Sequence, residues 1–302
     1  MIFVRDMKMH LQRKLVGHKG SVYSIVFDSG SQQIYSGGGD GWLVSWNRDE
    51  ADGKLIADVG DQIFCLSVIE GQRVVAGSMS GELYFIGLSS AAGPRKKVFH
   101  QKGIYDLLSI GRYLISAGGD GKLGFWNLET TEIEESIVLS HHRIRCLALS
   151  PDKSVLAVGD SHGDIRFLST DDWRLLHRIS AHDPSVFSLA WLDNERIVSG
   201  GRDAHLKVWD YHSTDEPQFD LAAHWYTVNH MQSHPSDTLL ATASRDKTIR
   251  LWETMNFSVV QTLDAARSGG HINSVNRLVW TDDGKQLFAG SDDNSISVWE
   301  FS

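Results

Sequence analysis

The side chains best suited to chemistry are histidines, hydroxyls and aspartates that recur together along the chain. Serine, histidine and aspartate can form a nucleophilic triad. The sets here recur at nearly fixed offsets, which indicates a structural role: a buried hydrogen-bonded chain that stiffens each unit. The four full sets, each ending on a tryptophan, are His18, Ser36, Asp40 and Trp46; His100, Ser116, Asp120 and Trp126; His182, Ser199, Asp203 and Trp209; and His224, Thr242, Asp246 and Trp252. A fifth set has His271, Asp293 and Trp299, but Ala289 replaces its hydroxyl.

These sets belong to a sequence repeat with a period of about 40 residues. Seven units are recognised by their closing runs, from residues 43–46 in the first to 296–299 in the last. Within the first unit, apolar runs at 22–27 and 33–36 are separated by polar turns, and the turn at 37–41 is rich in glycine. Short runs bounded in this way predict β-strands and hairpins. We find no amphipathic stretch long enough to predict a helix.

The repeat resembles that of the WD-repeat family. The resemblance rests on Gly17-His18 ahead of a first strand, on the pair Trp209-Asp210, and on its near variants Trp126-Asn127, Trp252-Glu253 and Trp299-Glu300. It implies an all-β, seven-bladed β-propeller with four antiparallel strands per blade. Ser80 and His162 replace the turn aspartate in units two and four, so we expect these two blades to be softer.

We predict a single domain over residues 1–302, in which residues 16–302 supply the seven repeats. The chain ends at Ser302, just after the third strand of the seventh unit. An open sheet edge is avoided only if the first and last blades join. Residues 1–15 are therefore expected to close blade seven, with 9–15 as its outer strand.

Composition narrows the classes of partner. The net charge of −9 disfavours nucleic acid and anionic membranes. Cys65 and Cys146 are too few for a disulfide scaffold, and no spacing suggests zinc. The charged N-terminus has no signal-peptide pattern, and no segment is long enough to span a bilayer. We expect a cytoplasmic, monomeric protein without metal or cofactor.

The resemblance also implies where partners bind, because family members present three positions per blade on the upper face. Those positions predict an aromatic arc on blades one to three and a cationic arc on blades four to six, with polar side chains nearby. Such types are enriched in interface cores. The predicted protein-binding residues are Tyr23, Phe64, Met79, Tyr105, Arg143, Arg145, Phe187, Arg202, Asn229, Arg245, Asn276 and Asp292. They predict a scaffold or adaptor, not an enzyme, that binds a peptide or protein segment of acidic or C-terminal carboxylate character.

Alternatives stay open at this point. The aromatic side chains could pack inward, with the arginines paired to neighbouring aspartates. A propeller hydrolase could use the channel, where Asp106, His230 and Arg277 share one inner-strand position. The arginines could instead serve an RNA-associated scaffold. In unit four, one member of His141-His142 is expected to be the repeat histidine. The insertion 264–270 is expected to be mobile, either as a flap that contacts a partner or as a tolerated insertion.

Overall fold

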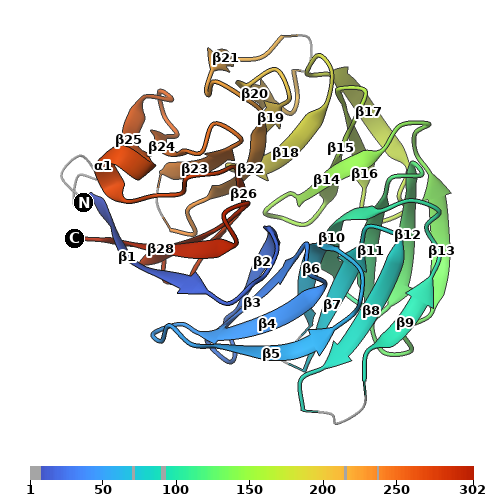
Figure 1. Ribbon diagram of the computed structural model, residues 1–302. Helices are drawn as coiled ribbons and strands as arrows, with labels where there is room; N and C mark the ends of the chain where they lie inside the picture. Colours follow the sequence, from blue (N-terminus) through green and yellow to red (C-terminus); the bar gives the residue numbers. More distant parts are fainter. Residues whose placement is uncertain (1–7, 70–71, 90–92, 214–215, 237) are drawn as a thin grey trace.

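A computed structural model describes residues 8–69, 72–89, 93–213, 216–236 and 238–302. These residues form seven four-stranded antiparallel sheets placed radially around a common centre (Figure 1). This arrangement confirms the predicted all-β, seven-bladed propeller.

Each blade runs outward from an inner strand to an outer strand, in sequence order for blades one to six. The inner strands are β2 (Val22–Asp28), β6 (Ile63–Ile69), β10 (Ile104–Ile110), β14 (Ile144–Leu149), β18 (Val186–Trp191), β22 (Val228–Ser233) and β26 (Val275–Trp280). The second strands are β3 (Gln33–Gly38), β7 (Arg73–Ser78), β11 (Tyr113–Gly118), β15 (Val155–Asp160), β19 (Arg196–Gly201), β23 (Leu239–Ser244) and β27 (Gln286–Ser291).

The outer half of each blade completes the sheet. The third strands are β4 (Trp42–Asn47), β8 (Glu82–Gly87), β12 (Lys122–Asn127), β16 (Asp164–Ser169), β20 (His205–Asp210), β24 (Ile249–Glu253) and β28 (Ser295–Phe301). The outer strands are β5 (Gly53–Asp58), β9 (Arg95–Val98), β13 (Ile133–Val138), β17 (Leu175–Ser180), β21 (Phe219–Ala222), β25 (Val259–Leu263) and, in blade seven, β1 (Met9–Val16).

The ring is closed by β1, which pairs antiparallel with β28 as predicted. A bulge between Leu11 and Arg13 changes which face of the sheet the side chains take. Met9 and Leu11 therefore pack towards blade six, whereas Leu15 packs into the core shared with blade one. The closing strand thus joins two inter-blade cores. Residues 1–7 of the predicted closing segment lie outside the described residues.

The apolar core lies between neighbouring blades. The second strand of each sheet is buried on both faces, and β23 is buried along its whole length. The outer strands are largely exposed, as in β9 and β13. Between blades one and two, for example, Leu43 packs with Ile63 and Val74. Repetition of this contact around the ring makes a stiff platform whose loops lie on two opposite faces.

The insertion at 264–270 contains a helical turn, α1 (Ala265–Ser268), which the sequence did not predict. Asp264 caps it by accepting the N–H of Arg267, and Gly269 ends it with a left-handed φ of 72°. Lys14 of β1 donates to the Gly270 carbonyl at 2.8 Å. The insertion is therefore a capped turn held against the closing strand; its predicted contact with a partner stays a prediction. In the described part of the chain, no helix has the length and apolar character required to cross a membrane.

Candidate functional site

The recurring histidine sets form the predicted hydrogen-bonded chains in blades one, three, five and six. In each, histidine Nδ1 lies 2.9 Å from the aspartate carboxylate and Nε2 lies 2.7–2.8 Å from the hydroxyl. The tryptophan Nε1–H donates to the same hydroxyl at 2.8–2.9 Å. The carboxylate can only accept, so Nδ1 carries the proton and Nε2 accepts the hydroxyl proton.

Burial and hydrogen bonding make these sets structural. Burial lowers the pKa of His18, His100 and His224 and outweighs the neighbouring carboxylate, so the rings are neutral. Burial alone would raise the pKa of Asp40, but its interaction with His18 and the hydrogen bonds from backbone N–H groups lower it overall. The hydroxyls of Ser36, Ser116 and Ser199 are fully buried. A nucleophile must reach its substrate, so these triads cannot act as hydrolase sites.

Blade seven restores the missing hydroxyl from the adjacent strand. Ala289 and Ser297 are directly opposite in the β27–β28 register. Ser297 Oγ lies 2.8 Å from His271 Nε2 and accepts from Trp299 Nε1 at 2.7 Å. His271 also contacts Asp293 at 2.9 Å. The chain of hydrogen bonds is therefore complete, although the unit departs from the repeat at Ala289.

Blade four fills the same place with an ionic network. Ser140, rather than His141 or His142, holds the repeat-histidine position, which corrects that expectation; the His142 ring stacks on His162, their centroids 4.5 Å apart. Ser140 Oγ donates to Asp160 at 2.8 Å, and Arg166 pairs with both Asp160 and Asp164. The missing histidine chain therefore gives no reason for blade four to be soft, and its softness stays a prediction.

The upper face is built by a bulge at the start of every inner strand. In each β-ladder between an inner strand and its neighbour, the register shifts at the second residue of the inner strand. A bulge leaves one residue unpaired and redirects its side chain. The seven unpaired residues, here called the bulge ring, are Tyr23, Phe64, Tyr105, Arg145, Phe187, Asn229 and Asn276.

Five members of the bulge ring are joined by ring contacts from blade one to blade five. Tyr23 meets Phe64 edge-on with 5.4 Å between centroids, and Phe64 stacks on Tyr105 at 5.5 Å. The Arg145 guanidinium lies 4.9 Å from the Tyr105 ring centroid and 4.6 Å from that of Phe187. A desolvated guanidinium between two aromatic faces gains about 2 kcal/mol or more from each favourable contact.

Arg145 has no counter-ion among the described residues. Burial and the charges of Arg143 and Arg202 lower its pKa, and its Nε is buried without a hydrogen-bond partner. The side chains of Arg143, Arg202 and Arg245 are exposed and also form no ion pair within the described ranges. Of the alternatives left open, pairing of these arginines with aspartates is therefore not observed.

The predicted polar residues of blades six and seven form hydrogen bonds within the protein. Asn229 donates to Ser274 and to the Val275 carbonyl, at 2.9 and 2.8 Å. Asn276 donates to the Val22 carbonyl at 3.1 Å and to Asp292 at 2.8 Å. Asn229 and Asn276 thus link neighbouring blades, and Asp292 holds Asn276 from within blade seven. Met79 stands apart, with 53% of its surface exposed.

Sequence reasoning missed exposed apolar side chains beside this ring. Trp225 and Tyr226 follow the repeat histidine of blade six and are 82% and 60% exposed; Ile272 follows that of blade seven and is 64% exposed. Other units carry Lys19, Gln101 or Asp183 at the equivalent position. This departure from polar to apolar type was a signal available in the sequence.

The residues proposed for a channel hydrolase are held by other contacts. Asp106 accepts the N–H groups of Leu107 and Leu147 at 3.1 and 2.9 Å, and Arg277 reaches it from blade seven at 3.2 Å. His230 Nδ1 accepts the N–H of Leu278. Within the described ranges, no group of three or more histidine, cysteine, aspartate or glutamate side chains could hold a metal ion.

The family model described as WD domain, G-beta repeat matches residues 9–47, 134–168, 173–210, 215–253 and 258–300, so the chain belongs to the WD-repeat family. Protein hir1 of Schizosaccharomyces pombe is 24% identical over 280 residues, covering 90% of this chain and 24% of hir1. The 66 kDa stress protein of Physarum polycephalum is 26% identical over 298 residues, covering 81% of this chain and 48% of that protein. The chain thus spans half or less of these two relatives.

Among solved structures, the WD40 β-propeller domain of Doa1 superposes with a TM-score of 0.85 at 18% identity, covering 97% of both chains. This similarity supports the fold alone. WD-repeat propellers are generally non-catalytic interaction scaffolds or regulators.

Proposed function

We propose that this protein is a non-catalytic interaction scaffold that binds a protein or peptide segment on its upper face. The segment carries an acidic side chain or a C-terminal carboxylate. The observation that carries the proposal is the Arg145 guanidinium, held between Tyr105 and Phe187 without a counter-ion in the described residues. A cation held in a desolvated place gains most from a charge-assisted hydrogen bond to a carboxylate.

The surroundings fit such a partner. Arg143, Arg202 and Arg245 add positive charge around Arg145, while Tyr23, Phe64 and Tyr105 offer a ladder of rings for an apolar side chain. Trp225 and Tyr226 extend the apolar surface over blade six. Buried aromatic and arginine anchors supply most of the binding energy in protein interfaces. The cytoplasmic location and the monomeric state expected from the sequence belong to this proposal.

The test is peptide display followed by fluorescence anisotropy. Random peptides with free C-termini are selected on the protein, and the enriched peptides are measured against wild type, Arg145→Glu and Arg202→Glu. The matched control is Arg174→Glu, at an exposed site in the turn between β16 and β17. We expect acidic or carboxylate-dependent peptides whose affinity falls at least about ten-fold in both upper-face variants and not in the control.

C-terminal amidation of the same peptides distinguishes a terminal carboxylate from an acidic side chain. Equal binding by all variants contradicts the proposal. Tight binding of single-stranded RNA with steep salt dependence, lost in the same variants, replaces it with the RNA-associated function.

A further inference from the structure

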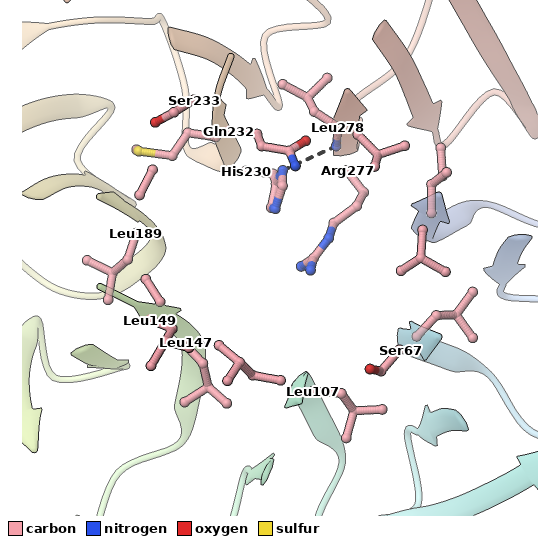
Figure 2. Close-up of a pocket in the computed structure, with 18 of the residues that line it drawn as sticks. Ser67, Leu107, Leu147, Leu149, Leu189, His230, Gln232, Ser233, Arg277 and Leu278 are labelled. Atoms are coloured by element: carbon pink, nitrogen blue, oxygen red, sulfur yellow. Dashed lines mark hydrogen bonds between the residues drawn. The ribbon is translucent and has the colours of Figure 1, made fainter. Parts of the chain in front are cut away.

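The lower half of the central channel contains a cavity of about 580 Å³, separate from the upper face. It is lined by all seven inner strands, from His230 and Arg277 down to Phe27 and Ser233, and by Pro151 just beyond β14. Figure 2 shows the side chains arranged around an open centre. The volume lies within the range of small-molecule sites.

The wall on blades one to five is apolar. Each of these blades places an aliphatic side chain at the equivalent inner-strand position: Ile25, Leu66, Leu107, Leu147 and Leu189. Ser67 and Ser109 interrupt this wall, and their hydroxyls bond to each other at 3.0 Å. A ligand along this side must present an apolar body.

Blades six and seven add Met231, Leu278 and Val279 to the apolar lining, but they also place polar donors on the wall. Arg277 has five N–H groups, and among the described residues its one hydrogen bond is from Nη2 to Asp106. Asp106 already accepts two backbone N–H groups, and it does not line the cavity. Figure 2 shows the Arg277 guanidinium extending into the middle of the open space.

His230 and Gln232, like Arg277, have hydrogen-bond donors that are left over after their internal contacts. The N–H of Leu278 donates to His230 Nδ1 at 3.2 Å, so the proton of the neutral ring lies on Nε2. Gln232 Oε1 accepts the N–H of Trp280 at 2.9 Å, which leaves its amide NH₂ as a donor. None of the described residues that line the cavity is acidic.

We propose that this lower cavity binds a small amphipathic carboxylate, with the head on Arg277 and His230 and the apolar body against the aliphatic wall. Guanidinium–carboxylate bonds are directional and roughly twice as strong as neutral ones. Asp106 already pairs with the same guanidinium at 3.2 Å, so like-charge repulsion favours a monoanion over a phosphate dianion. The site is independent of the upper-face function proposed above.

The test is isothermal titration calorimetry with decanoate, below the concentration at which it forms micelles, and with decylammonium as the matched probe of opposite charge. Wild type is compared with Arg277→Gln and with Ser109→Trp, which places a ring at the exposed lower end of β10 inside the cavity. The control is Arg145→Gln, which changes the upper face only.

We expect saturable 1:1 binding of decanoate, about ten-fold or greater loss in Arg277→Gln, loss in Ser109→Trp and no change in Arg145→Gln. Decylammonium is expected to bind at least about ten-fold more weakly than decanoate. Absence of saturable decanoate binding, equal binding of the two probes, or full binding by Ser109→Trp each overturns the proposal. If Arg277→Gln does not fold, the probe comparison and Ser109→Trp decide the result.

Discussion

Blade six and blade four fill the same buried place with opposite chemistry. In blade six, a neutral His224 joins Thr242 to Asp246 and only one carboxylate is present. In blade four, Arg166 is buried between Asp160 and Asp164, and Asp160 also accepts from Ser140 and from the His162 N–H. The first network is largely a chain of neutral hydrogen bonds, whereas the second depends on compensated charges.

The comparison shows that any polar group at this place must be satisfied, and that no particular set of residues is required. Blade two supports the same conclusion, because Ala76 and Ile86 stand where the hydroxyl and the tryptophan stand elsewhere, and both pack in an apolar core. A fully apolar filling and a fully satisfied polar filling are both stable, while a half-satisfied network is not.

The largest expected effect comes from removing the buried cation of blade four, which blade six does not need at this place. Arg166→Ala leaves Asp160 and Asp164 buried without their cation, and we expect a loss of about 3–5 kcal/mol of unfolding free energy. Denaturant unfolding measures it. Arg178→Ala is the control, since its half-exposed side chain meets Asp164 at 3.4 Å and is expected to matter by at most about 1 kcal/mol. Equal losses in the two variants would remove the distinction.

A smaller loss is expected when the neutral network of blade six is broken. Thr242→Val keeps the shape but leaves the Trp252 N–H and His224 Nε2 without their partner. We expect a loss of about 1–3 kcal/mol by the same unfolding measurement. Thr262→Val, on the outer strand of the same blade, is the matched control and should stay near wild type. An unchanged unfolding free energy in Thr242→Val would show that the hydroxyl adds nothing to stability.

Blade seven adds a third case, because its hydroxyl comes from Ser297 on β28 and not from β27. Ser297→Ala should cost about 1–3 kcal/mol, for the same reason as in blade six. Adding Ala289→Ser returns a hydroxyl to the usual position, and we expect the double variant to recover most of the loss in a double-mutant cycle. Additive destabilisation by the two changes would mean that the two positions are not equivalent.

The smallest expected effect is the dependence of stability on pH that the repeat histidines contribute, such as His224 in blade six. Burial lowers the folded pKa of His224 from its ordinary value of 6.5. Below that value the unfolded chain takes up a proton that the folded chain refuses, so stability is full above about pH 6.5 and falls as the pH drops towards the folded pKa. Unfolding free energies near neutral and mildly acidic pH measure the difference.

His224→Gln should reduce this pH dependence, whereas Ser140→Ala in blade four should leave it unchanged. In blade four, burial raises the pKa of Asp160 but Arg166 and Ser140 lower it overall, so its contribution is lost only below the ordinary aspartate value of 3.8. An unchanged pH dependence in His224→Gln would refute the assignment.

The sequence predicted the positions of many candidate-site residues, but it did not predict the contacts that their side chains make. The repeat placed Tyr105, Arg145 and Phe187 at equivalent positions of consecutive units, and the structure joins them into one sandwich. The same positional reasoning offered Asn229 and Asn276 as contact residues, yet they are occupied by hydrogen bonds between blades. Side-chain pairing across a blade boundary depends on the tilt of neighbouring sheets, which the residue pattern does not encode.

The sequence alone was enough to predict the number of blades and their strand order, because periodicity and hairpin pairing involve residues close together in the chain. Closure by β1 pairs residues from opposite ends of the chain, and it was predicted because the seventh unit lacked an outer strand. Three contacts became visible only in the tertiary structure: Ser297 replaces the hydroxyl lost at Ala289, Arg166 and Ser140 both bind Asp160 in blade four, and Arg277 reaches Asp106 across the channel. Those contacts depend on strand register and on ring geometry, and both exist only once all seven sheets are assembled.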